Sequence, residues 1–166
     1  MRTKAAIRED LRAKRAALTP DQVAAASKTV SEKVLREVDW VAMQSAHIYA
    51  GYGAWNELDT AELCVRLKRL LPDIAIDVPA IAPDAEFPDG QFDAIIVPVL
   101  GFDRRGYRLG LGKGWYDRFL AGQPQALKIG LAYSWAEVPA LPHEPHDVPL
   151  DVIITERAAI TISPPV

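Results

Sequence analysis

The sequence predicts a doubly wound α/β fold, with a mostly parallel sheet and helices on both of its faces. Short apolar runs rich in β-branched residues, typical of buried strands, alternate along the chain with amphipathic runs typical of helices. Such alternation favours parallel strands joined by helical crossovers. At 166 residues and without an internal repeat, the chain is expected to form one domain over residues 1–166.

The first predicted helix spans residues 3–17 and has two stripes at helical spacing. The apolar stripe consists of Ile7, Leu11 and Leu18. The basic stripe consists of Lys4, Arg8, Arg12 and Arg15. We interpret Arg12 and Arg15 as part of a solvated face, and Lys4 and Arg8 as candidate contacts of an anion.

The second predicted helix spans residues 19–37 and carries a clear start signal. Thr19 suits the cap position, Pro20 suits the first helical position, and Gln22 completes a capping box with Thr19. Nothing in this helix points to chemistry, so its predicted role is structural.

The middle of the chain is predicted to alternate between strand and helix. The segments in order are a strand at 46–50, a helix at 60–71, a strand at 73–78 and a proline-rich loop at 79–90. His47 alternates with apolar neighbours, and we interpret it as structural rather than as a ligand. Cys64 is the single cysteine, so the chain has no internal disulfide, and its helical setting indicates a core-facing thiol.

The second half of the chain supplies the remaining strands. They are predicted at 94–97, 126–133 and 151–155, with a possible edge strand at 160–162. The loop 139–149 carries His143 and His146, whose spacing resembles a metal-ligand pair. Because the loop has no thiolates and is rich in proline, a metal site there is the weaker of the two interpretations.

Composition narrows the class of protein. The formal net charge is −3, which argues against a nucleic-acid partner. No stretch of about 18 apolar residues is present and the N-terminal segment is charged, so no membrane partner is expected and the predicted location is cytoplasmic.

The stretch with the strongest chemical signal is 100–120, LGFDRRGYRLGLGKGWYDRFL. A buried strand leads into it, a helix is expected to begin at Trp115, and the glycines between are Gly106, Gly110, Gly112 and Gly114. A glycine-rich basic loop between a strand and a helix start is typical of a phosphate site. The stretch matches neither the P-loop nor the dinucleotide fingerprint. The alternative interpretation is a tight glycine turn with solvated arginines.

Positive charge gathers in two separate segments of this acidic chain. Residues 1–15 carry six basic and two acidic side chains, and residues 102–118 carry five basic and two acidic ones. Two basic segments in an acidic body indicate one shared anionic ligand, which predicts that the first helix lies close to the glycine-rich loop.

The segment from Asp103 to Asp117 also resembles the nucleotide-binding signature of the 5-formyltetrahydrofolate cyclo-ligase (methenyltetrahydrofolate synthetase) family. The family pattern is roughly D-x-x-G-x-R-L-G-x-G-x-G-Y-Y-D, and Trp115 replaces its first tyrosine. The resemblance covers most of the chain from Lys4 to Glu156. It implies ATP as co-substrate, Mg²⁺ as cofactor and a reduced folate as substrate.

The resemblance also assigns residues to roles. Catalytic roles in charge neutralisation are implied for Arg108 and Lys113. ATP contacts are implied for Lys4, Arg8, Arg108, Leu109, Gly110, Leu111, Gly112, Lys113, Gly114, Trp115 and Tyr116. Substrate contacts are implied for Glu57, Trp55, Trp115 and Tyr116. Magnesium ligands are implied at Asp117 and Asp147, and carboxylates are the oxygen donors that Mg²⁺ prefers.

The implied reaction converts 5-formyltetrahydrofolate into 5,10-methenyltetrahydrofolate with release of ADP and phosphate. Segment 79–92 is shorter than the family usually has, and Phe87 is a candidate to replace part of the missing wall of a folate pocket. Two alternatives stay open. One is a related ATP-dependent enzyme for a smaller substrate, and the other is a non-catalytic nucleotide-binding module.

Overall fold

The computed structural model describes residues 2–79 and 85–163 and contains one main sheet of six strands in the order β2-β1-β3-β6-β7-β8. Its strands are β1 (Ser45–Ile48), β2 (Ala75–Asp77), β3 (Ala94–Pro98), β6 (Leu127–Leu131), β7 (Val152–Ile154) and β8 (Ala159–Thr161). All neighbouring pairs are parallel except β7 with the edge strand β8, which is antiparallel. The mostly parallel sheet is therefore confirmed.

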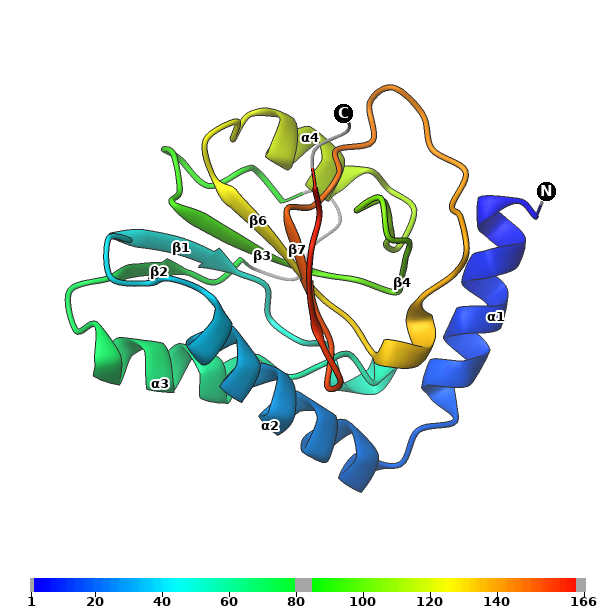
Figure 1. The fold of residues 1–166 in the computed structure, drawn as a ribbon, viewed down its shortest axis with the longest axis horizontal. Helices are drawn as coiled ribbons and strands as arrows, with labels where there is room; N and C mark the ends of the chain where they lie inside the picture. The colour runs from blue at the N-terminus through cyan, green and yellow to red at the C-terminus, as the bar shows by residue number, and fades with distance from the viewer. Residues whose placement is uncertain (1, 80–84, 164–166) are drawn as a thin grey trace.

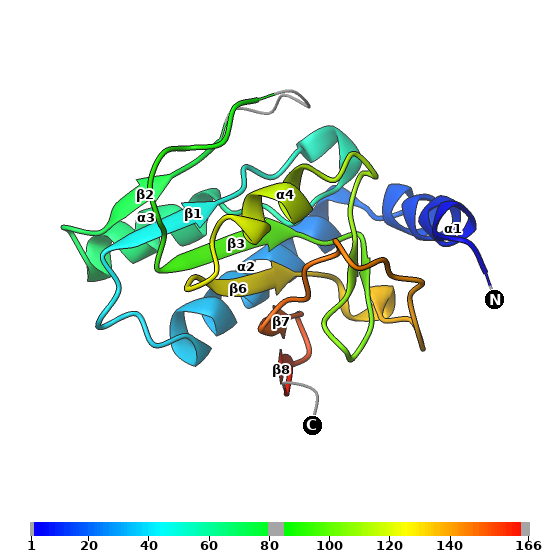
Figure 2. The same cartoon turned by 90° about the horizontal axis from the view of Figure 1, so that it is seen from above.

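Helices cover both faces of this sheet, as predicted. The helices are α1 (Lys4–Ala16), α2 (Pro20–Glu37), α3 (Ala61–Leu70) and α4 (Trp115–Ala121). Figures 1 and 2 show α2 and α3 on one face and α4 on the other. Strand residues alternate accordingly: Ile96 packs in the core cluster with α2 and α3, and Ile95 in the cluster with α4. Helix α1 lies beyond the carboxyl ends of the strands (Figure 1).

The strand order reverses direction beside β1, which creates a topological switch point at the carboxyl edge of the sheet. After β1 the chain moves outward to β2 and then crosses back to β3 on the other side of β1. In open α/β sheets, ligands bind outside the carboxyl ends of the strands at such a reversal. Segment 49–57 leaves β1 there, and the glycine-rich stretch leaves β3 there.

The predicted elements match the structure to within a few residues, with one addition. The capping box of α2 is present, with Thr19 Oγ accepting from the Gln22 amide and the Gln22 side chain accepting from the Thr19 amide. The glycine-rich stretch, predicted as loop, contains an antiparallel hairpin of β4 (Gly101–Phe102) and β5 (Arg108–Leu109). Buried Asp103 stabilises it by accepting from Arg105 and from the Leu141 amide.

Two single-residue interpretations have clear outcomes. Arg15, which the sequence placed on a solvated face, is buried at 6% exposure. The reason is spacing, because Arg15 follows Ile7 and Leu11 at intervals of four residues and so shares their buried face. His47 is completely buried and hydrogen-bonded, as its structural interpretation requires.

Part of the predicted loop 79–90 lies outside the described residues, at 80–84. Over the rest of the chain, no helix has the length and hydropathy needed to cross a membrane.

Candidate nucleotide and substrate site

The glycine-rich loop after β5 offers unpaired backbone donors. Among the described residues, the amides of 111–114 donate to no backbone or side-chain acceptor. The hairpin anchors the loop at one end, since the Leu100 amide donates to the Leu109 carbonyl at 2.8 Å. Adjacent open N–H groups on a fixed loop form a binding surface for an anion.

Two glycines in this loop have a backbone that other residues rarely adopt. Gly112 has φ +95° and Gly114 has φ +68°. A Cβ atom at Gly112 would also lie 3.2 Å from Cζ of Arg8. Glycine at 112 therefore serves two purposes: it permits the turn and lets the Arg8 guanidinium approach the loop.

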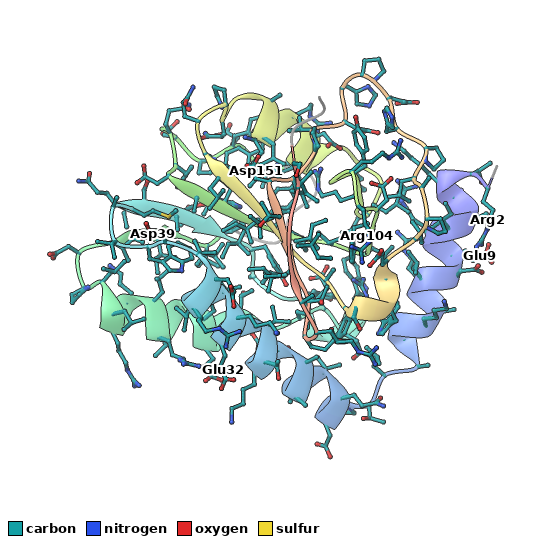
Figure 3. All side chains as sticks on the ribbon, in the orientation of Figure 1. Arg2, Glu9, Glu32, Asp39, Arg104 and Asp151 are labelled. Carbon is teal, nitrogen blue, oxygen red and sulfur yellow. The ribbon has the colours of Figure 1, made fainter. Side chains whose placement is uncertain are left out.

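Helix α1 and the glycine-rich loop are in direct contact, as the two basic segments predicted. Arg8 Nε donates to the Gly110 carbonyl at 3.0 Å, and Arg12 Nη2 reaches the Leu111 carbonyl at 3.4 Å. A groove of about 490 Å³ runs between them, lined by Ala5, Arg8, Glu9, Arg12, Leu111 and Gly112. Figure 3 labels Glu9, which borders this groove, and Arg2 at the start of the chain, near the N-terminal end of α1.

Most of the positive charge in the loop segment is already paired. Arg105 binds Asp103, and Arg104 (labelled in Figure 3) binds Glu137. Lys113 is exposed, and no ion pair joins it to a described residue. Lys113 therefore remains available to bind a phosphate. The count of basic residues in the segment did not distinguish it from the paired arginines.

The two predicted magnesium ligands lie in one neighbourhood, each beside a cation. Arg108 Nη1 lies 2.9 Å from Asp117 Oδ1, which also accepts from the Val148 amide at 3.2 Å. Lys4 Nζ lies 2.5 Å from Asp147 Oδ2. Burial raises the pKa of Asp147, but hydrogen bonds from Lys4 and from the Glu144 amide outweigh it and leave that pKa below its usual value. The Asp147 carboxylate is thus set to stay ionised.

No cluster of three or more histidine, cysteine, aspartate or glutamate side chains in the described residues could hold a metal. The His143 ring instead stacks on Tyr107, with centroids 3.9 Å apart. His146 lies beside Glu144 on the surface. The weaker metal interpretation of loop 139–149 thus gains no support, while a site completed by phosphate oxygens needs only two protein carboxylates.

Glu57 lies near the same edge of the sheet, in a largely buried position. Its Oε2 accepts from the Tyr52 amide at 2.8 Å. Burial raises the pKa of Glu57, and the Tyr52 amide and the charge of Arg15 oppose that rise. A carboxylate here retains unused lone pairs and can accept N–H bonds from a ligand.

Arg15 is the charged neighbour of Glu57 that sequence reasoning missed. Its guanidinium donates to no described residue, and no fully buried side-chain nitrogen or oxygen in the described part of the chain lacks a partner. The guanidinium therefore keeps some contact with solvent although the residue as a whole is buried. The Asn56 side chain fixes the end of α1 by donating to the carbonyls of Arg15 and Leu18.

Tyr116 connects the phosphate loop with Glu57. It lies in the first turn of α4, and burial, followed by the charge of Glu57, raises its pKa, while Arg108 lowers it. The Tyr116 side chain is thus within electrostatic range of both Glu57 and Arg108. Neighbouring Trp115 packs edge-on against Phe87 at 5.1 Å and donates from Nε1 to the Ala85 carbonyl.

The remaining predicted contacts lie in different environments. Trp55 is 44% exposed in a 3-10 turn and packs on Tyr52. Leu111 is 47% exposed at the groove. Leu109 is buried against Ile7 and Leu11, so only its backbone can face a nucleotide.

A doubly wound sheet with an open amide loop, basic side chains and a largely buried carboxylate at its switch point is an arrangement typical of α/β proteins that bind phosphate-bearing ligands. Comparison with known proteins refines this class. The sequence profile of the 5-formyltetrahydrofolate cyclo-ligase family matches residues 54–156. The chain belongs to this family.

Individual relatives agree with the family match. A 5-formyltetrahydrofolate cyclo-ligase of Mycoplasma pneumoniae is 39% identical over 96 residues, which is 55% of this chain and 58% of that protein. A solved 5,10-methenyltetrahydrofolate synthetase from Mycoplasma pneumoniae has a TM-score of 0.79 at 27% identity, covering 92% of this chain and 98% of that one. The Aquifex aeolicus synthetase has a TM-score of 0.78 at 25% identity, covering 98% and 94%.

These coverages bear on the short central segment. The curated sequence match spans less than two thirds of the relative, but the structural matches span nearly all of both chains. The two solved synthetase chains are therefore of similar length to this chain.

Proposed function

We propose that this protein converts 5-formyltetrahydrofolate into 5,10-methenyltetrahydrofolate, consuming ATP and releasing ADP and phosphate. The observation that carries the proposal is the arrangement of Glu57 and the open-amide loop at one switch point, with Tyr116 in the first turn of the helix that follows the loop. A heterocycle at Glu57 and a triphosphate at the loop would bring the formyl group and the γ-phosphate together.

The nucleotide half of the site would use the loop and α1. The amides of 111–114 would bind phosphate oxygens, with Lys113 and Arg108 neutralising charge. Arg8 already contacts the loop, and Lys4 would move from Asp147 to the phosphates. Because phosphoryl transfer depends mainly on positioning and on neutralising charge, this set suffices without a covalent nucleophile.

The folate half would use Glu57 and the groups around it. The Glu57 carboxylate would accept two N–H bonds from the aminopyrimidine edge of the pterin. The formyl oxygen would then attack the γ-phosphorus as ADP leaves. N10 would attack the formyl carbon, lose its proton and expel phosphate, which closes the ring.

The donor set fits a magnesium ion. Asp117 and Asp147 would hold it together with phosphate oxygens and water, and the ion would neutralise charge on the phosphates. Both carboxylates now lie beside cationic side chains, so the fit requires Lys4 and Arg108 to transfer their contacts to the nucleotide.

The direct test is the absorbance of methenyltetrahydrofolate formed by purified protein with ATP, Mg²⁺ and 5-formyltetrahydrofolate. We expect product with all three present and none without ATP. Lys113→Ala should weaken ATP binding about 5- to 150-fold, the range of a charge-assisted contact.

The open alternatives make different predictions in the same assay. An enzyme for a smaller substrate would bind ATP without hydrolysing it faster when 5-formyltetrahydrofolate is added. A nucleotide-binding module would bind ATP and turn over nothing. Either result would overturn the proposed activity while leaving the nucleotide site intact.

A further inference from the structure

His47 is buried at the centre of a hydrogen-bond chain that the proposed reaction does not yet use. Its Nδ1 lies 2.7 Å from Asp77 Oδ2, and its Nε2 lies 3.2 Å from the Tyr116 hydroxyl. Asp77 is its direct partner on the neighbouring strand β2. The chain thus runs from the edge of the sheet to the first turn of α4.

The direction of these hydrogen bonds follows from the chemistry of the groups. Burial lowers the pKa of His47, and the bond to Asp77 only partly opposes this, so the ring is neutral and carries one N–H. The Asp77 carboxylate can only accept, which places that N–H on Nδ1. Nε2 is then an acceptor, and the Tyr116 hydroxyl must donate to it.

Packing holds the His47 ring in place. The ring is completely buried among Phe92, Trp115 and Phe119, with the Phe119 centroid 4.8 Å away. Because the hydroxyl hydrogen of Tyr116 is committed to His47, its oxygen has only lone pairs left to offer a ligand. A ligand group that binds this oxygen must therefore be a hydrogen-bond donor.

We propose that His47 and Asp77 are positioning residues that fix the Tyr116 hydroxyl as a hydrogen-bond acceptor for a ring N–H of the folate heterocycle. The inference rests on the proposed function, since it takes a reduced folate as the ligand. Tyr116 packs against the core cluster that contains Leu58, the residue after Glu57, so both would select for N–H groups on the same heterocycle. The expected consequence of this arrangement is a preference for reduced folates, because the reduced pterin ring carries more N–H donors than the oxidised ring.

The first experiment measures kinetics for a matched set of variants. His47→Asn keeps a donor towards Asp77 but loses the acceptor at Nε2, whereas His47→Gln can place an amide oxygen near it. We expect His47→Asn to raise KM for 5-formyltetrahydrofolate about three- to tenfold, the effect of one hydrogen bond, with KM for ATP unchanged. His47→Gln should have a KM for 5-formyltetrahydrofolate close to that of the wild type.

A double-mutant cycle separates positioning from packing. In a Tyr116→Phe background, His47→Asn should cause no further rise in KM, because the hydroxyl it orients is gone. Phe92→Leu is the packing control: it disturbs the same cluster and should lower the melting temperature without raising KM. Additive effects of His47→Asn and Tyr116→Phe, or an equal rise in KM for ATP, would overturn the proposal.

A second readout does not depend on turnover. In ¹⁵N-histidine-labelled protein, with His47 assigned by its absence in His47→Gln, we expect the Nδ1–H tautomer. A proton on Nε2 would overturn the inference whatever the activity. A protein that binds 5-formyltetrahydrofolate without converting it, and binds it less tightly as His47→Asn, would support the inference while overturning the proposed reaction. If it neither binds nor converts that folate, both fail.

Discussion

The two halves of the site differ in how far solvent reaches their charges. In the phosphate half, Lys113 is exposed and the Lys4–Asp147 ion pair lies partly in reach of solvent, although the Arg108 side chain is buried. In the heterocycle half, Glu57 and Arg15 are both largely buried. Exposed charges are screened by salt and buried ones much less. The comparison predicts salt-sensitive binding of nucleotide and salt-insensitive binding of the heterocycle.

The largest expected effect tests the heterocycle half. Glu57→Gln should lower kcat/KM for 5-formyltetrahydrofolate about 100-fold or more, because the amide cannot accept two charge-assisted N–H bonds. ATP affinity should not change. Steady-state kinetics and ATP titration check this, and an unaltered kcat/KM would remove Glu57 from the site.

The pH dependence of the free energy of unfolding provides a control for Glu57→Gln. Burial raises the pKa of Glu57 above its value in the unfolded chain. Ionisation of Glu57 therefore lowers the free energy of unfolding, and this loss is complete once the pH has risen through the folded-state pKa. Glu57→Gln should therefore be at least as stable as the wild type at neutral pH, with the difference vanishing in acid. A melting temperature lower at neutral pH would indicate a structural role instead.

The next effect tests the phosphate half. Asp117→Asn should lower kcat about 10- to 100-fold and raise the magnesium concentration needed for half-maximal activity. Asp103→Asn is the matched control, since Asp103 pairs with an arginine in the same segment but faces no predicted ligand. It should lower the melting temperature and leave the magnesium requirement unchanged. The magnesium dependence of activity checks both variants.

Arg15→Gln should have an intermediate effect confined to the heterocycle half. Arg15 lowers the pKa of Glu57, so its removal should move the acid limb of the kcat/KM profile to higher pH. We also expect KM for the folate to rise about tenfold, on the scale of a hydrogen bond to a charged group. Lys14→Gln removes the same charge from an exposed neighbour and should change neither quantity.

The smallest expected effect compares two arginines on α1. Arg8→Ala should weaken ATP binding about fivefold at low salt and less at high salt, because Arg8 lies against Gly112 where phosphate is expected. Arg12→Ala, whose contact with the loop is longer, should change affinity less than about twofold. Calorimetric titrations at two salt concentrations check the pair, and equal effects would contradict the assigned boundary of the site.

The difference between the phosphate half and the heterocycle half also explains which parts of the site could be predicted from the sequence. Phosphate recognition depends on local features, namely glycines that open the backbone and basic residues between them, so 103–118 was recognisable on its own. The contact between α1 and the loop followed from the charge distribution. Whether residues 1–166 form one domain, and which residues bind which ligand, stay predictions.

The heterocycle half depends on tertiary contacts that a linear pattern does not contain. His47 has a role only because Asp77 on the neighbouring strand and Tyr116 on α4 reach it from different elements. The hairpin of β4 and β5 is too short for periodicity to reveal. Arg15 was recognisable from its four-residue spacing after Leu11, but its charge favoured the opposite interpretation.

The contact between Lys4 and Asp147 joins residues 143 positions apart and has a consequence for folding. Contacts so distant in sequence form late, because a long loop must close before they contribute. During synthesis, α1 emerges well before the strand and loop that it will contact. The nucleotide half thus becomes complete only after nearly all the described chain has left the ribosome, so a truncated chain would lack the Lys4–Asp147 pair.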